Sequence, residues 1–244
     1  MAGIETCIDV PSFKALVDLG LGDQASARRR HVFVTHAHVD HLGGLAHHVA
    51  IRALHRLPSP VYYVPLPIVG RVERLLDVWR ELQEDKLPAD VIGLEPGARV
   101  PRRADQEVRT FATDHRVPSL GYLFVQRTKR LRRDLVGTAG HVLAARRKAG
   151  EEIEDVSEVI ELAIAGDSRI DALLADREVL RARRLVMEVT FLDERVSVAD
   201  ARAKGHTHLD ELAAHAAEFE NEALLLCHVS ARYGAAEAQA LVDA

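Results

Sequence analysis

Apolar runs and amphipathic stretches alternate along this chain of 244 residues, and their order predicts strands that alternate with helices. We expect buried strands at 32–34, 61–64, 162–165, 184–191 and 223–228, weaker ones at 90–94, 98–101 and 107–113, and a hairpin over 4–19. One helix is predicted from a stripe that we expect to pack in the core, namely Ile68, Val72, Leu75, Leu76, Trp79 and Leu82. Other helices are expected over 42–56, after His208 and at the C-terminal end. This alternation favours a layered α/β architecture, and the absence of a repeat or linker predicts one domain over 1–244.

The densest group of chemically active side chains follows the run 32–34. Three imidazoles and a carboxylate lie within six residues there, from His36, His38, Asp40 and His41. In an extended segment His36, His38 and Asp40 point to the same side, and His41 enters from the turn into the next helix. Imidazole nitrogens and carboxylate oxygens suit a divalent ion such as zinc. The motif therefore predicts a metal site at the end of this strand.

Further acidic and imidazole side chains stand at the ends of other predicted strands or in the loops beside them. They are Asp18, His115, Asp167, Glu188, His206 and His228. In a layered α/β domain we expect such positions to form a site along one edge. A site for two ions needs a group that bridges them at ~3.5–4 Å, and the carboxylate of Asp167 is the natural candidate. His47, His48 and His55 fall on the predicted helix 42–56, so we expect them on the surface or behind the ligands.

Composition excludes several classes of protein. The hydrophobic share of 48% and the charged share of 28% fit a globular protein, and the net charge of −5 gives no general affinity for nucleic acid. Cys7 and Cys227 are the two cysteines, which argues against a disulfide framework and for a reducing compartment. We see no signal-peptide pattern at the N-terminus and no apolar run near the ~20 residues that span a bilayer. We therefore expect a cytoplasmic protein without a membrane partner.

The segment 35–44 resembles the signature of the metallo-β-lactamase superfamily, whose members are mostly binuclear hydrolases. With later segments it resembles ribonuclease Z, the endonuclease that removes the 3′ trailer of precursor tRNA, and most closely the compact plant-type short form. The matching segments are 113–122, 166–167, 186–193, 205–208 and 228–233. The resemblance implies a four-layer αββα metallo-β-lactamase sandwich and a metal-dependent phosphodiesterase. It also implies two divalent ions per chain, with zinc expected first and manganese as the alternative.

The same resemblance assigns roles to the candidate residues. His36, His38 and His115 hold the first ion, Asp40, His41 and His228 hold the second, and Asp167 bridges the two. Asp18 orients a ligating histidine. Asp40 also orients or deprotonates the attacking water, and His206, supported by Glu188, protonates the leaving 3′ oxygen. The family further implies a homodimer.

Some features of the family are missing, and they bear on the substrate. Met187 stands where many members have histidine, and neither a Pro-x-Lys-x-Arg-Asn loop nor the long tRNA-binding arm with its Gly-Pro motif is recognisable. A basic segment is the candidate contact for precursor tRNA, through Arg127, Lys129, Arg130, Arg132 and Arg133, although a solvated surface explains its charge as well. Two alternatives stay open. One is a hydrolase of a small phosphodiester, ester or lactone, and the other is a metal-binding protein without turnover.

Overall fold

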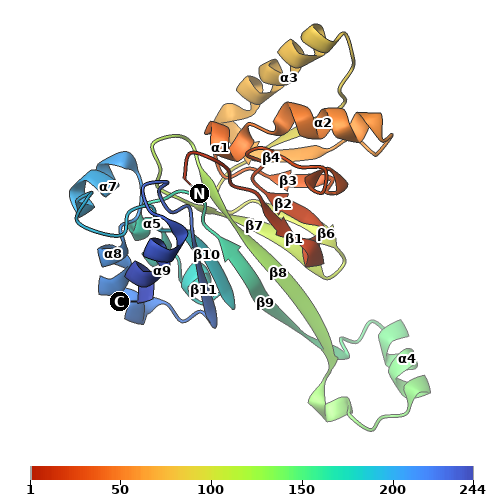
Figure 1. The fold of residues 1–244 in the computed structure, drawn as a ribbon. Coiled ribbons are helices and arrows are strands. Elements are labelled where there is room, and N and C mark those ends of the chain that lie inside the picture. The colour runs from red at the N-terminus through yellow and green to blue at the C-terminus, as the bar shows by residue number, and fades with distance from the viewer. Residues whose placement is uncertain (1, 244) are drawn as a thin grey trace.

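Two β-sheets lie face to face in the computed structural model, which describes residues 2–243 (Figure 1). The first has five strands in the order β1-β2-β3-β4-β5. Their bounds are β1 (Ile8–Val10), β2 (Ala15–Val17), β3 (His31–Phe33), β4 (Val61–Pro65) and β5 (Asp90–Leu94). The β1–β2 pair is antiparallel, which confirms the predicted N-terminal hairpin, and the other pairs are parallel.

The second sheet has six strands in the order β11-β10-β9-β8-β7-β6. Their bounds are β6 (Arg99–Arg103), β7 (Gln106–Ala112), β8 (Leu120–Leu131), β9 (Glu154–Ile164), β10 (Arg184–Glu188) and β11 (Ala223–Cys227). Strands β6 to β9 pair antiparallel, whereas β9, β10 and β11 are parallel. The parallel strands of both sheets end near the same edge of the molecule, and the polar strand-end residues gather there.

Alternation along the strands sorts the apolar side chains into separate cores. Phe33 faces the other sheet and stacks on Tyr63 with ring centroids 4.5 Å apart, while its neighbour Val32 points to the opposite side, toward the helices. The helices over the first sheet are α1 (Val39–Leu42), α2 (Leu45–Leu54) and α3 (Val69–Gln83). The second sheet is covered by α5 (Ile170–Leu174), α6 (Arg177–Leu180), α7 (Val198–Lys204) and α8 (Leu209–Ala214), with α9 (Ala235–Asp243) following β11. The predicted four-layer αββα sandwich is confirmed.

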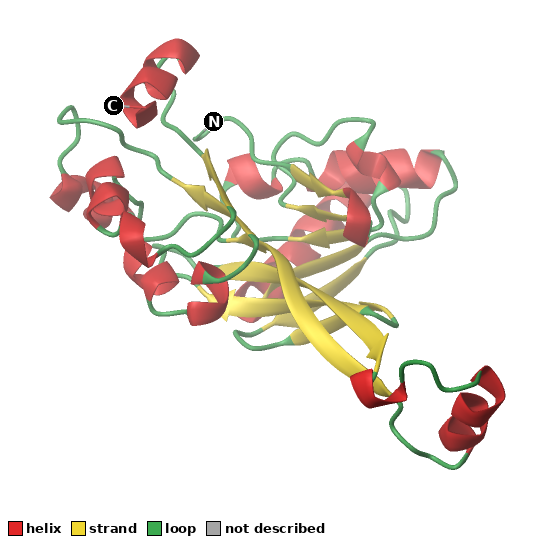
Figure 2. Ribbon diagram, turned by 90° about the horizontal axis from the view of Figure 1, so that it is seen from below, coloured by secondary structure: helices red, strands yellow, loops and turns green. Residues whose placement is uncertain are grey.

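Strands β8 and β9 continue well beyond the sandwich as a two-stranded arm (Figures 1 and 2). Their pairing runs on from Gln126 opposite Val159 to Leu131 opposite Glu154. The tip carries the short helix α4 (Gly140–Lys148) and a small apolar cluster of buried Leu135 and Ile153. The chain therefore has an arm, which the sequence did not reveal, although the Gly-Pro motif is absent from it as the sequence shows. The arm has no third sheet strand or core to cover, so its strands lack the apolar alternation that predicts a strand.

Two other expectations need correction. The predicted helix 42–56 is shorter, α2 at Leu45–Leu54, and α1 precedes it as a separate turn; between them the loop 19–22 approaches so closely that a Cβ atom on Gly44 would lie 2.6 Å from the carbonyl oxygen of Leu21. The stripe on α3 is only partly core, since Leu75 and Trp79 are 42% and 38% exposed. Among residues 2–243, no helix combines the length and apolar character needed to cross a bilayer.

Candidate metal centre

The sequence-predicted ligands follow four separate strands and meet in one place. His36 and His38 follow β3, and Asp40 and His41 lie in the first turn of α1. The others are His115 between β7 and β8, Asp167 after β9, and His228 after β11. Parallel strands present their carboxyl ends along one edge, which explains why residues 192 positions apart in the chain, 228 − 36, become neighbours.

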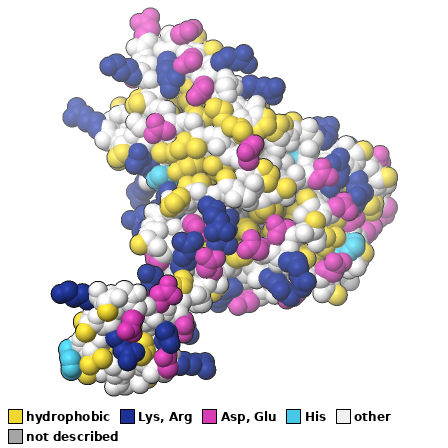
Figure 3. All heavy atoms as spheres, turned by 180° about the vertical axis from the view of Figure 1, so that it is seen from behind, with side chains coloured by type: hydrophobic (Ala, Val, Ile, Leu, Met, Phe, Trp, Pro, Cys, Tyr) yellow, Lys and Arg dark blue, Asp and Glu magenta, His cyan; other side chains and the backbone are white. Residues whose placement is uncertain are grey.

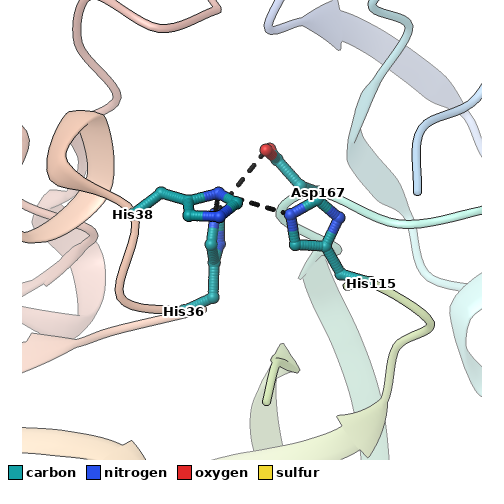
Figure 4. Close-up of side chains that lie close together, drawn as sticks. All are labelled: His36, His38, His115 and Asp167. Atoms are coloured by element: carbon teal, nitrogen blue, oxygen red, sulfur yellow. Dashed lines mark hydrogen bonds and ion pairs between the residues drawn. The ribbon is translucent and has the colours of Figure 1, made fainter. Parts of the chain in front are cut away.

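His36, His38, His115 and Asp167 form the first group (Figure 4). Their candidate ligand atoms all lie within 4.8 Å of one another. His38 Nδ1 is 3.0 Å from His36 Nε2 and 3.4 Å from His115 Nε2, and Asp167 Oδ2 is 3.6 Å from His36 Nε2. Three imidazole nitrogens and one carboxylate oxygen therefore surround a common point, as a tetrahedral zinc site requires.

Asp40, His41 and His228 form the second group beside it. His228 Nε2 lies 3.3 Å from Asp40 Oδ2 and 3.4 Å from His41 Nε2. Asp167 reaches this group as well, because its Oδ1 is 3.5 Å from His41 Nε2 and its Oδ2 is 3.3 Å from His228 Nε2. Asp167 Oδ1 is buried and accepts no hydrogen bond. An unpaired buried carboxylate oxygen between two imidazole groups is what a bridging metal ligand would leave behind, so the residues fit two ions.

In four of the five histidines, the ring nitrogen that points away from the centre donates to a fixed acceptor. His41 Nδ1 donates to Asp18 at 2.7 Å, which confirms that Asp18 orients a histidine of this group. His115 Nδ1 donates to the Gly205 carbonyl at 2.8 Å, and His36 and His228 use Nδ1 on the hydroxyls of Thr35 and Thr190, each at 3.1 Å. These four rings therefore direct a lone pair on Nε2 toward the centre, as ligating histidines need. His38 is the exception and presents Nδ1.

Two carboxylates support this arrangement in the same way on opposite sides. Asp18 binds His41 directly and accepts the Thr35 hydroxyl at 2.7 Å, which in turn holds His36. Glu188 binds His206 directly and accepts the Thr190 hydroxyl at 2.6 Å, which in turn holds His228. The two threonines stood in the sequence motifs, but nothing in the sequence indicated that they would link a carboxylate to an imidazole.

Charge in the centre is arranged for cations. Burial lowers the pKa of His36 strongly and that of His115 to about 4, so both rings are neutral near pH 7. Burial also lowers the pKa of His41, but the carboxylates of Asp18, Asp167 and Asp40 outweigh it and raise the value to about 9. Burial raises the pKa of Asp167 to about 6. A proton on His41 thus offsets part of the negative charge of these carboxylates, and a divalent ion would displace it.

His206 lies beside both groups but is held differently. Its Nδ1 donates to Glu188 Oε1 at 2.8 Å, which leaves that nitrogen no lone pair for an ion. Burial lowers the pKa of His206, and the hydrogen bond and charge of Glu188 raise it above its ordinary value overall. Glu188 is itself fixed by the backbone N–H groups of Thr190 at 2.9 Å and Thr207 at 3.2 Å. The His206 ring is therefore oriented, and Nε2 is the atom from which it can exchange a proton.

Other predicted residues lie outside the centre. His208 is buried and caps α8, where its Nδ1 accepts the Asp210 N–H. Met187 packs in the core between the second sheet and its helices, so the absence of a histidine there removes nothing from the centre. His48, expected on the surface or behind the ligands, is instead buried against Tyr62, whose hydroxyl lies 2.8 Å from His48 Nδ1.

No protein-family model matches the chain. A metallo-β-lactamase fold protein of Bacillus subtilis superposes with a TM-score of 0.61 at 15% identity, over 94% of this chain and 80% of that one. The short form of human tRNase Z also gives 0.61, at 20% identity over 93% and 85% of the two chains. These likenesses show that the chain has the metallo-β-lactamase fold. The chain is 37% identical to tRNase Z TRZ1 of Arabidopsis thaliana across 100% of its own length and 88% of the relative. It belongs to the ribonuclease Z family and is a metal-dependent hydrolase.

Proposed function

We propose that this protein is a binuclear endoribonuclease that removes the 3′ trailer of precursor tRNA, with zinc as its resident metal. The main support is the buried Asp167 carboxylate, which lies between two imidazole groups and leaves Oδ1 unpaired. His36, His38 and His115 would hold one ion, Asp40, His41 and His228 the other, and Asp167 both. Five imidazoles favour zinc over the harder manganese ion. When bound, the ions supply Lewis acidity and an activated water.

The remaining residues divide the proton transfers between them. Asp40 Oδ2 is anchored by the Gly3 N–H at 2.7 Å, and the hydrogen bond with His228 helps to hold the Asp40 pKa well below its usual range. An ionised Asp40 can orient the attacking water and accept its proton. Glu188 holds His206 Nδ1, so His206 delivers its Nε2 proton to the leaving 3′ oxygen. The products are a tRNA with a 3′-hydroxyl and a trailer with a 5′-phosphate.

The arm supplies the contact for the body of the tRNA in this proposal. Arg127 is paired with Glu107 and Glu158, and Arg132 with Asp134, so these two arginines are already neutralised. Within residues 2–243, the arm cations that have no ion partner are Lys129, Arg130, Arg133 and Lys148. The arm that carries them projects well away from the rest of the protein (Figure 2), where it could reach a distant part of a folded RNA. These four cations are therefore the proposed RNA contact, in place of the five basic residues that the sequence suggested within 127–133.

The exposed side of α3 is the proposed surface for a second copy of the chain. Leu75, Val78, Trp79 and Leu82 are 42%, 51%, 38% and 69% exposed and recur at the i, i+3, i+4, i+7 spacing of one helix face. Figure 3 shows hydrophobic side chains between charged ones in the upper part of the molecule, where α3 lies in Figure 1. A continuous apolar helix face of this kind is typical of a homodimer interface. In sedimentation, the unmodified protein should be a dimer that Trp79→Glu dissociates. A monomer whose sedimentation does not change in Trp79→Glu would contradict this assignment.

A direct assay separates the proposed function from its alternatives. Zinc-loaded protein should cut a tRNA that carries a 3′ trailer and should leave the stated end groups. Turnover of bis(p-nitrophenyl) phosphate without any cleavage of the precursor would instead identify a hydrolase of small diesters. Replacing Lys129, Arg130 and Arg133 by Gln should flatten the slope of log Kd for precursor tRNA against log salt by up to about 2–3. Arg132→Gln is the matched control, because Asp134 already offsets its charge.

A further inference from the structure

A cavity lies directly beside the metal centre. It has a volume of about 500 Å³ and shares His115 as a wall with the first ligand group. Most of its lining is apolar and comes from three loops that carry Leu66, Leu94 and four prolines, at positions 65, 67, 96 and 118. Leu66 is 47% exposed and packs over Gly93, where a Cβ atom would lie 2.5 Å from the leucine side chain. The size and lining match a pocket for a flat apolar group with a few polar contacts.

The cavity has few polar side chains, and the hydrogen bonds between them do not use all of their donors and acceptors. Thr113 donates to Ser119 Oγ at 2.7 Å, and the Ser119 hydroxyl has no acceptor of its own among residues 2–243. The Glu95 carboxylate is exposed and likewise makes no side-chain hydrogen bond within the described part of the chain. One free donor and one free acceptor beside apolar walls match the edge and face of a nucleobase.

Arg116 stands between this cavity and the metal centre. It lines the cavity and packs against the loop that carries His206. Its Cγ lies 3.1 Å from the position that a Cβ atom on Gly205 would occupy. Arg116 is exposed and has no ion partner in the described part of the chain. Arg116 directly follows the candidate ligand His115 and packs against Gly205, the residue before His206, so the guanidinium lies near the place where the scissile phosphate would bind. An uncompensated guanidinium in this position suits a phosphate.

We propose that this cavity binds the base of a nucleotide next to the scissile phosphate and that Arg116 binds a phosphate of the same nucleotide. The inference rests on the proposed function, because it assigns part of the same RNA substrate. Because His115 lines both the cavity and the metal centre, the nucleotide bound in the cavity must be one of the two that flank the cleaved bond. Base recognition here adds selectivity at the cut, independently of the distant arm.

The first test combines a variant that fills the cavity with substrates that lack one base. Leu66→Trp should raise KM for trailer-bearing precursor tRNA about tenfold, within the range found for single base contacts. Deleting the base on one side of the scissile bond should raise KM similarly for the unmodified protein. Leu66→Trp should then have no further effect on that substrate, while it keeps its effect when the opposite base is deleted. Leu54→Trp, on an exposed position of α2, is the matched control for added bulk.

A second variant keeps the test decisive if Leu66→Trp unfolds, which its thermal midpoint would reveal. Arg116→Gln should flatten the slope of log KM against log salt by about 0.7, the value for one phosphate on a single strand, and Arg116→Lys should restore it. Equal effects of Leu66→Trp on both base-deleted substrates, or an unchanged salt slope in Arg116→Gln, would overturn the inference. Failure of the unmodified protein to cut precursor tRNA would overturn the proposed function, and the inference with it.

Discussion

Replacing Asp18 by Asn tests whether the support behind the ligands determines metal affinity. The Asp18 carboxylate is buried and accepts three hydrogen bonds of 2.7 Å, from the Thr35 N–H, the Thr35 hydroxyl and His41 Nδ1. Asn keeps one acceptor for the Thr35 N–H but puts an amide where Oδ2 receives the other two. Asn also tolerates the backbone φ of +61° at this position, so the backbone should not change. His41 can then keep a hydrogen bond only by moving its proton to Nε2, the atom that faces the centre.

The expected cost follows from those contacts. Each hydrogen bond to a charged acceptor contributes ~1.5–3 kcal/mol, and rotation of the Thr35 hydroxyl recovers part of one, so unfolding in urea should show a loss of about 2–4 kcal/mol. Loss of a partner behind a metal-binding histidine typically lowers affinity ~10–100-fold, measurable by competition with a zinc-binding dye. Asp9→Asn, which removes a surface pair with Arg29, is the control and should cost at most ~1 kcal/mol with no change in affinity. A loss below 1 kcal/mol in Asp18→Asn, together with unchanged zinc affinity, would refute this reasoning.

Three further predictions concern the metal, the proton donor and pH. Elemental analysis of zinc-loaded protein should give two ions per chain and fewer after His38→Ala; a single ion in the unmodified protein would contradict the bridging role of Asp167. His206→Ala should keep both ions and lower kcat by ~10²–10⁴-fold, and loss of metal would show that it is a ligand. Burial lowers the His48 pKa to about 4, so the unfolded chain binds more protons and stability falls as the pH drops from about 6.5 toward 4. Between pH 7 and 4.5, the free energy of unfolding of metal-free His48→Gln should fall by about 2–3 kcal/mol less than that of the unmodified chain. Replacing the exposed His55 by Gln should leave the fall the same as in the unmodified chain. If the curve for His48→Gln ran parallel to that of the unmodified chain, the assignment would be wrong.

The layered fold could be predicted because each core strand carries its own signal. The run 61–64 is buried on both faces and matches β4 to within one residue, whereas β10 begins at the predicted residue 184 but ends at 188, three residues before the predicted end at 191. The strand-end positions of Asp167 and His228 likewise followed from the chain order. Their convergence with His36 is a consequence of parallel strands ending at one edge, which is a property of the fold class and can be reasoned before any coordinates exist.

The arm could not be predicted, because its stability does not come from a hydrophobic pattern. Polar side chains occupy both faces of the paired strands between 126 and 131, and ion pairs replace the core at the base. Arg127 binds Glu107 and Glu158, while the nearly buried Arg109 joins the same two glutamates. In the sequence these charges resemble an ordinary solvated segment. Partners 31 positions apart, such as Arg127 and Glu158, become visible only after the strands have been paired.

Backbone strain at the centre explains why the supporting residues were hardest to foresee. Asp18 and His228 both have left-handed backbones, with φ of +61° and +56°, although neither is glycine. Each stands where the chain leaves a strand and must turn at once to direct a side chain inward, and such conformations cost of order 1–3 kcal/mol. Asp18 recovers that cost through its three hydrogen bonds, and His228 through Thr190. The hydrogen bonds that orient these side chains therefore also help to stabilise the backbone that presents them.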